Sequence, residues 1–321
     1  MMNSMLSLEA YHSNKDTAIN EISNFLKQGS LALFLGSGVS CSIGLPNWTD
    51  IVYHCANSKN IVKKITNDTP ITELLRILEE IHDECDEKTD EFKNLVSSCF
   101  EKFHKNYGYE NILNGKLLTA IGALLIPCKT RGFISEVVTY NFDDILEWYL
   151  ALHGIGTEVI YSLPYLARDS DITIYHPHGY LPQGKKIGNQ ITTGENSSRF
   201  IFDQYSYECV IGNTSDTWNQ MISNILERKI ALMVGLSYED IPLRVMTTQV
   251  YEKLNKYSSF KDGRDWRPIG VLLKIDKELE GVNLNEYYKR GIAPIGFEDY
   301  DDIWKFLLDV CQANLPQEFL K

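Results

Sequence analysis

The chain lacks the segments that membrane and secreted proteins carry. No apolar run approaches the roughly 20 residues that a membrane-spanning helix needs. Residues 1–16 are too polar to contain the apolar core of a signal peptide. Basic residues are outnumbered, with 31 Lys and Arg against 43 Asp and Glu and a net charge of −12 at pH 7. These absences predict a cytoplasmic protein that neither enters a membrane nor binds nucleic acid directly.

Cysteine is scarce and scattered. The seven cysteines are Cys41, Cys55, Cys85, Cys99, Cys128, Cys209 and Cys311. No two of them form the C-x-x-C pair from which cysteine-rich structural zinc sites are built. We therefore predict no metal site and no bound zinc, and we expect reduced, mostly buried thiols.

What is present fits a globular α/β protein. Hydrophobic residues make up 44% of the 321, and aromatic residues 11%, which excludes a disordered chain. Apolar runs alternate with polar turns and helical patterns. The predicted strands are 31–35, 134–140, 158–161, 171–175, 229–234, 268–275 and 291–297. This order predicts a Rossmann-like, mostly parallel sheet with helices on both faces.

Residues 51–129 have a different hydrophobic pattern from the rest of the chain. Apolar side chains recur there at helical spacing, in stripes over 71–81 and 92–103. We predict one domain over 1–321, whose sheet core comes from 31–50 and 130–321 and whose helical insert module lies over the nucleotide cleft. The acidic stretch 79–91 is interpreted as a solvated helix face, with partner binding as the alternative. Residues 183–199 are predicted to form a loop or hairpin.

Polar clusters follow several of the predicted strands, at 36–40, 139–144, 176–179 and 235–240. Ligands of parallel sheets bind at the carboxyl ends of the strands, and a glycine-rich turn after a strand is typical of phosphate binding. Simpler interpretations stay open. Asn141 and Asp143 could cap the following helix, and His178 could be a core histidine. His176 and His178 could also form an H-x-H metal pair, although no third ligand is evident.

Together these segments resemble the sirtuin family. The resemblance rests on GSGVS and GLPNW within 36–48, TYNFDD at 139–144, HPHGY at 176–180 and GLSYED at 235–240. Sirtuins show a Gly-x-Gly-x-Ser turn with a Gly-x-Pro loop, then Thr-x-Asn-x-Asp, His-Gly and Gly-x-Ser, in this order. The nearest group is similar to the sirtuin-type NAD hydrolases of bacterial antiphage defence.

Two departures from deacylating sirtuins bear on the reaction. Their four-cysteine zinc module follows the His-Gly motif, where this chain has only Cys209 before the later strands. Their first loop reads Pro-Asp-Phe-Arg, where this chain has Pro-Asn-Trp-Thr at 46–49. The resemblance then implies that NAD⁺ is cleaved with water as acceptor, giving nicotinamide and ADP-ribose. A dehydrogenase is disfavoured, because the region where its ribose-binding acidic residue would end a second strand has a helical pattern.

The resemblance also implies roles for individual residues. Asn141 would orient the attacking water or the ribose, and His178 would act as the base. The residues expected around NAD⁺ are Gly36, Ser37, Gly38, Ser40, Pro46, Trp48, Thr139, Asp143, Gly235, Ser237 and Asp276.

Alternative functions stay open at this point. The chain could be a sensor that binds NAD or ADP-ribose without turnover, or a zinc-free deacylase or ADP-ribosyltransferase. An NAD⁺-depleting enzyme also needs control. We expect this control from a homo-oligomer, from a partner such as a HerA-type ATPase, or from a sensor domain outside this chain.

Overall fold

The computed structural model describes most of the chain. The described residues are 7–61, 63–66, 68–86, 89–104, 109–166, 168–183, 199–213, 216–257, 267–313 and 315. The segment 183–199, predicted as a loop or hairpin, lies almost wholly outside them. Within the described part of the chain, no helix is both long and apolar enough to span a bilayer.

A parallel sheet of seven strands, in the order β3-β4-β2-β1-β5-β6-β7, forms the centre of the molecule. The strands are β1 Leu31–Leu35, β2 Glu136–Thr139, β3 Thr157–Ile160, β4 Ile172–Tyr175, β5 Ile230–Val234, β6 Gly270–Ile275 and β7 Ile292–Phe297. Each predicted strand is present, with bounds that differ by at most two residues at either end. β1 lies between β2 and β5, so every side chain of β1 is buried.

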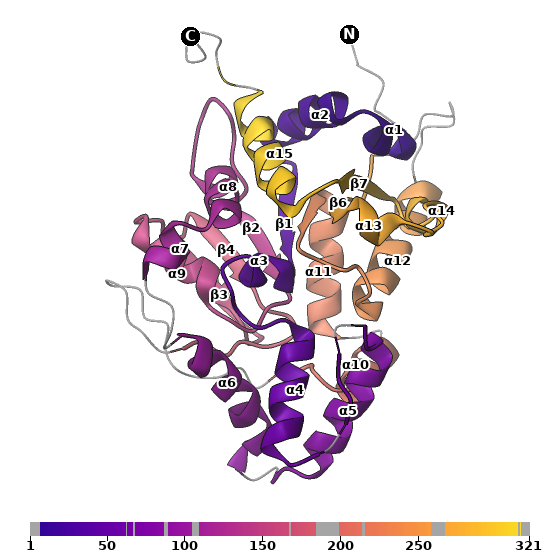
Figure 1. Cartoon of the computed structure of the whole chain (residues 1–321). Helices are drawn as coiled ribbons and strands as arrows, with labels where there is room; N and C mark the ends of the chain where they lie inside the picture. Colours follow the sequence, from indigo (N-terminus) through magenta and orange to yellow (C-terminus); the bar gives the residue numbers. More distant parts are fainter. Residues whose placement is uncertain are drawn as a thin grey trace.

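Helices cover both faces of the sheet (Figure 1). They are α1 Leu8–Ser13, α2 Lys15–Lys27, α3 Ser37–Cys41, α4 Trp48–Ser58, α5 Ile71–Asp83, α6 Glu91–His104, α7 Tyr109–Leu113, α8 Lys116–Leu125, α9 Ile145–Leu152, α10 Gln204–Gly212, α11 Thr217–Arg228, α12 Ile241–Tyr257, α13 Asp276–Leu279, α14 Asn285–Tyr288 and α15 Tyr300–Gln312. Successive side chains of a strand point to opposite faces. Leu33 and Leu35 therefore pack with α2, α8 and α15, whereas Ala32 and Phe34 pack with α11 and α12. The predicted α/β class is confirmed.

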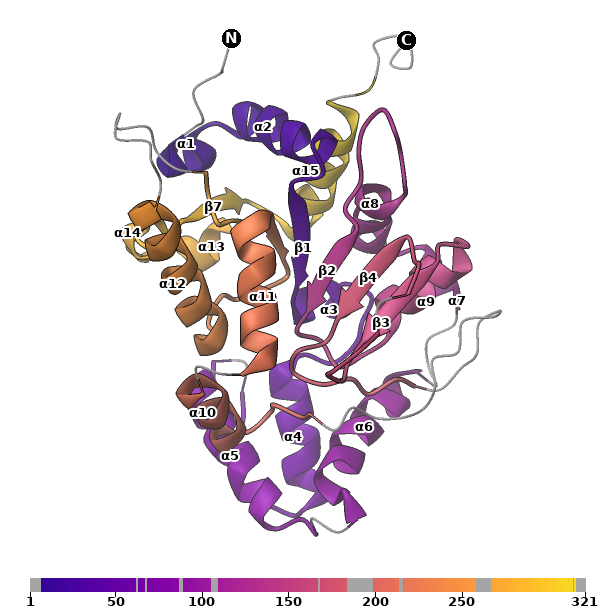
Figure 2. The same ribbon diagram turned by 180° about the vertical axis from the view of Figure 1, so that it is seen from behind.

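Helices α4, α5, α6 and α10 gather at one end of the molecule, on the side where β1 ends (Figures 1 and 2). Helix α4 begins at a capping box, in which Asn47 and Asp50 each accept a hydrogen bond from the other's backbone N–H. The stripe predicted over 71–81 becomes the buried face of α5, through Leu74, Leu78 and Ile81. Helix α8 lies elsewhere, against α15 and α9 on one face of the sheet.

The segment 36–40 differs from its prediction. We predicted a tight turn, but Gly36 is the N-cap of the short helix α3, which begins at Ser37. Two helices of the central region, α10 and α11, had no counterpart among the predicted elements. The apolar residues of α10 are spread around the helix. Helix α11 carries a stripe at helical spacing, Trp218, Ile222, Ile225 and Leu226, which the prediction overlooked.

Candidate functional site

The loops after β1 and β5 touch at the point where the chain changes direction across the sheet. From β1 the chain continues to β2 on one side, and from β5 to β6 on the other, so the two loops diverge there. The Gly38 N–H donates to the Gly235 carbonyl at 3.0 Å. A side chain on Gly235 would place its Cβ 2.7 Å from the Val39 nitrogen, and one on Gly36 would collide with the Gly235 carbonyl oxygen. Glycine at these positions allows the two backbones to meet.

These contacts change the expected use of the glycine amides. We predicted that the N–H groups of this turn would face phosphate. Instead, the Gly36 N–H donates to the Val234 carbonyl at 3.1 Å, and the Gly38 N–H is engaged at Gly235. Ser37 is half-buried at the start of α3. The glycines of this segment thus join two loops in the structure, and contact between the segment and a pyrophosphate stays a prediction.

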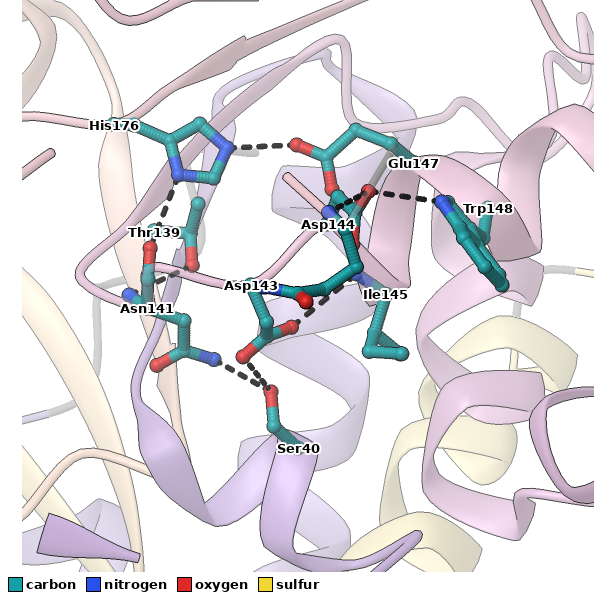
Figure 3. A network of polar contacts seen from close by, with 10 residues as sticks. Ser40, Thr139, Asn141, Asp143, Asp144, Ile145, Glu147, Trp148 and His176 are labelled. Atoms are coloured by element: carbon teal, nitrogen blue, oxygen red, sulfur yellow. Dashed lines mark hydrogen bonds and ion pairs between the residues drawn. The ribbon is translucent and has the colours of Figure 1, made fainter. Parts of the chain in front are cut away.

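The side chains of Ser40, Asn141 and Asp143, all predicted site residues, are joined in one hydrogen-bonded network (Figure 3). The Asn141 side-chain amide donates to the Ser40 hydroxyl at 3.0 Å and to the Gly36 carbonyl at 3.1 Å. The Ser40 hydroxyl in turn donates to Asp143 Oδ2 at 2.7 Å. Asn141 Oδ1 accepts no hydrogen bond from the described residues, and the residue is only half-buried. The amide is therefore held through its nitrogen, while its oxygen is left to a ligand or to water.

A buried histidine fixes the backbone of Asn141. His176 Nδ1 lies 3.0 Å from the Asn141 carbonyl oxygen, which can only accept, so this ring nitrogen carries a hydrogen. His176 Nε2 lies 2.7 Å from Glu147 Oε1 of α9 (Figure 3). His176 is 0% exposed and Glu147 3%. The imidazole and the carboxylate thus share a proton away from water and hold the turn after β2 in place.

Two further carboxylates are buried in this turn. Asp143 accepts from Ser40 and from the Ile145 N–H, but burial outweighs these bonds and raises its pKa to about 6. Asp144 accepts from the Trp148 ring N–H at 2.9 Å and from the Gln183 N–H at 3.1 Å. Burial raises the pKa of Asp144 to about 7, and the charges of Glu147 and Asp143 add to the rise.

His178 lies at the end of β4, the strand next to β2, and is 4% exposed. Its ring packs edge-on against Tyr140 and Tyr207, with centroids 4.7 Å and 5.4 Å away. Its Nε2 lies 3.4 Å from Asp240 Oδ2. Burial, helped by the charge of Arg199, lowers the pKa of His178 to about 3. The imidazole is neutral at physiological pH and is enclosed among aromatic rings.

The two histidines of the HPHGY segment have separate partners. His176 meets Glu147 and the Asn141 carbonyl, whereas His178 meets Asp240. Across the described residues, no group of three or more His, Cys, Asp or Glu side chains is arranged to hold a metal ion. The open alternative of an H-x-H metal pair therefore has no third ligand in this part of the chain.

Of the remaining predicted residues, Thr139 is bonded to this network and the others have different surroundings. Thr139 accepts from the Asn141 N–H at 3.2 Å and belongs to the network. Pro46 is buried, and the Trp48 ring packs on Phe202 with centroids 4.5 Å apart. Ser237 is exposed beyond β5. Asp276 is exposed after β6, which β5 separates from β1.

One comparison with known proteins gives a family match. Residues 135–264 match the SIR2-like domain. The match spans the network residues that follow β2 and the loops that follow β4 and β5, whereas the segment 36–48 precedes it. The SIR2-like domain supports a sirtuin-like family, whose members are typically NAD-dependent enzymes, and it indicates NAD-related activity. A comparison with curated proteins gave no match.

Sequence reasoning missed several residues of the candidate site. It did not single out Glu147, Asp144, Tyr207 or Asp240 for a functional role, and it considered His176 only as a metal ligand. Asp144 and Asp240 stood inside the quoted segments and could have been noticed there. Glu147 and Tyr207 have no local signal, because only the packing of α9 and α10 brings them to the centre.

Proposed function

We propose that this protein hydrolyses NAD⁺ at the bond between nicotinamide and ribose, giving nicotinamide and ADP-ribose. The observation that carries the proposal is the fixed side chain of Asn141, whose amide nitrogen is bound by Ser40 and by the Gly36 carbonyl while its oxygen is left open. The network lies where two loops diverge at the carboxyl ends of parallel strands, which is where such sheets bind nucleotides.

The chemistry of the bond fits what these residues can do. Nicotinamide is a good leaving group when it departs from NAD⁺, so cleavage needs a positioned ribose and one oriented water molecule more than a strong acid. Asn141 Oδ1 can accept a hydrogen bond from that water or from a ribose hydroxyl. Because Ser40 fixes the amide nitrogen, the amide oxygen is already in place before the ligand binds. The contact between this oxygen and the water or ribose therefore needs no further ordering of the side chain.

His178 is proposed to accept the proton. A base must be unprotonated before the reaction, and burial keeps this imidazole neutral. Asp143 supports Asn141 through Ser40, and the loops at Gly36–Ser40 and Gly235–Ser237 would flank the phosphates and the adenosine ribose. Pro46, Trp48 and Asp276 are assigned to the rim of the nucleotide site on the resemblance alone.

The biological role follows from the reaction. A cytoplasmic enzyme that hydrolyses NAD⁺, with water as the only acceptor, would deplete the cell of NAD⁺. The resemblance to antiphage-defence enzymes suggests this role. Such an enzyme must be inactive until it is triggered. We propose control through a homo-oligomer, a HerA-type ATPase partner or a sensor domain outside this chain.

The test is incubation of the purified protein with NAD⁺, alone and with the products of neighbouring genes. Nicotinamide and free ADP-ribose should accumulate in equal amounts. ADP-ribose attached to protein would instead favour a transferase. NAD⁺ binding by calorimetry without product would favour a sensor, a candidate that the burial of His178 specifically supports.

A further inference from the structure

Asp240 lies beside His178 and is not accounted for by any role described so far. Its Oδ1 accepts from the Leu243 N–H at 2.8 Å and so caps the start of α12. Its Oδ2 is buried and accepts no hydrogen bond from the described residues. The nearest ring nitrogen is His178 Nε2, at 3.4 Å.

A buried carboxylate oxygen without a donor is unfavourable, because it has lost water and gained nothing in exchange. Two donors face this carboxylate. One is the Tyr207 hydroxyl, which interacts with Asp240, and the other is the ring nitrogen of His178, 3.4 Å from Oδ2. The capped Oδ1 fixes the rotation of the carboxylate, so Oδ2 stays on the side of the His178 ring and the Tyr207 hydroxyl.

The groups facing His178 come from four segments. Tyr140 follows β2, Tyr207 belongs to α10, Arg199 precedes α10, and Asp240 follows β5. Among these four, only Asp240 can carry a negative charge at neutral pH. The Arg199 charge and burial both disfavour a protonated imidazole. A proton taken up by His178 therefore depends on Asp240 for electrostatic compensation.

We propose that Asp240 is the positioning residue of His178. In the resting state the Asp240 carboxylate accepts a hydrogen bond from His178 Nε2–H, which leaves Nδ1 unprotonated. During NAD⁺ hydrolysis, Nδ1 takes the proton released by water or by a ribose hydroxyl, and the imidazolium that forms is paired with Asp240. The proton then leaves to solvent, and the ring returns to its first form. This role rests on the proposed function, but the tautomer of His178 does not.

Asp240→Asn gives the sharpest test. The Leu243 N–H keeps the Asn oxygen in the capping position, so the new NH₂ group replaces Oδ2 and faces His178. An NH₂ group can only donate. The Tyr207 oxygen can accept one of its two hydrogens and Nε2 the other, which moves the hydrogen of the imidazole to Nδ1. Nitrogen-15 spectra of histidine-labelled protein distinguish the two tautomers, and His178→Gln identifies the signal. Asp240→Ser keeps a capping oxygen and serves if Asp240→Asn does not fold.

The expected result is an Nε2–H tautomer in the parent protein, an Nδ1–H tautomer in Asp240→Asn, and no preferred tautomer in Asp240→Ser. Turnover of Asp240→Asn should fall by roughly 10²–10⁴ with KM nearly unchanged. Glu239→Gln, at an exposed neighbouring position, should change neither readout.

Identical imidazole spectra in the parent and in Asp240→Asn would overturn the proposal. An inverted tautomer with unchanged turnover would overturn the positioning role as well. If the parent released no nicotinamide, the proposed function would fail, while the spectra would still decide whether Asp240 sets the tautomer.

Discussion

The side chain of Ser40 connects the segment after β1 to the loop after β2. Its hydroxyl accepts from the Asn141 amide and donates to Asp143, so a single oxygen orders both groups. This arrangement explains why a small hydroxyl residue is useful at the end of α3. A larger side chain would displace the two partners, and an apolar one would leave both polar groups unsatisfied.

Ser40→Ala should therefore weaken both stability and turnover. Loss of the donor to buried Asp143 Oδ2 should lower the free energy of unfolding by about 1–3 kcal/mol. Loss of the anchor for Asn141 should lower turnover about 100-fold, because the amide oxygen is no longer held in place. Urea denaturation and nicotinamide release measure the two effects. The control is Ser42→Ala, at an exposed hydroxyl on the same segment, and equal effects of both changes would contradict this account.

The buried carboxyl of Asp144 predicts a pH effect on stability. Its folded-state pKa of about 7 lies above its ordinary value of 3.8, so the folded protein holds the proton more tightly. This contribution is complete below the ordinary value and is lost as the pH rises through about 7. Asp144→Asn, which remains neutral, should thus gain stability over the parent on going from pH 5 to pH 8, by on the order of 2–3 kcal/mol.

Two features keep this comparison specific. His178 contributes in the opposite direction, because its pKa of about 3 makes stability rise with pH up to its ordinary value of 6.5. This term is present in both proteins and cancels in the difference. Asp169→Asn, at an exposed aspartate, is the matched control. A stability difference between Asp144→Asn and the parent that is the same at both pH values would refute the assignment.

At the scale of elements, the structure depends on the close contact between the loops after β1 and β5. Gly235 has a φ of +68° and no room for a Cβ near Val39. Gly281 has a similar φ of +71°, but a Cβ there would meet no atom within 4 Å. The two glycines share the backbone strain of a substitution and differ only in the contact.

Gly281→Ala should cost about 1–2 kcal/mol of unfolding free energy, for the left-handed backbone alone. Gly235→Ala should cost roughly 1–3 kcal/mol more, because the added methyl group pushes the loops apart. It should also weaken NAD⁺ binding, which Gly281→Ala should leave intact. Chemical denaturation and calorimetry decide between these outcomes, and equal costs for the two variants would show that the loop contact contributes nothing.

The pair of His176 and Glu147 connects β4 to α9 beneath the site. Glu147→Ala should lower the free energy of unfolding by about 3–5 kcal/mol, because it leaves a buried imidazole without its partner. Glu147→Gln keeps a neutral hydrogen bond to Nε2 and should cost no more than about 1.5 kcal/mol. Turnover should follow the same order, since His176 also holds the Asn141 backbone. If Glu147→Gln were as unstable as Glu147→Ala, the hydrogen bond to His176 Nε2 would not be what stabilises this pair.

How far the sequence predicts these elements depends on the kind of signal. Apolar runs such as 31–35 and 230–234 identify central strands, because a strand buried on both faces has no polar position. The stripe in α5 identifies a helix with one buried face. Helix α11 has such a stripe too, and it was overlooked. Helix α10 carries a weaker pattern, and α3 begins at a glycine segment that local rules assign to a turn. Such elements are fixed by tertiary packing, which outweighs local preference.

At the scale of the whole molecule, the most direct sequence signal is a polar residue that follows a strand. Parallel strands end at one edge, so Ser40, Asn141 and His178 were predicted to lie near one another from order alone. Ser40 and Asn141 are hydrogen-bonded, whereas a shared cleft for Asn141 and His178 stays a prediction. Hydrogen-bond direction was not predictable in this way. The engagement of the Gly36 and Gly38 amides, the buried pair under Asn141 and the approach of Asp240 all depend on how distant elements pack.

The central claim is that the network of Ser40, Asn141 and Asp143 is a hydrolytic site for NAD⁺. The most direct measurement is nicotinamide release in a single turnover by the parent and by Asn141→Ala, at concentrations where calorimetry shows equal NAD⁺ occupancy. We predict release of one nicotinamide and one free ADP-ribose per site by the parent, and a rate lower by roughly 10²–10⁴ for Asn141→Ala. Equal rates of nicotinamide release by the two proteins at equal occupancy would contradict the account. So would a parent protein that binds NAD⁺ in the presence of the products of neighbouring genes but releases no nicotinamide.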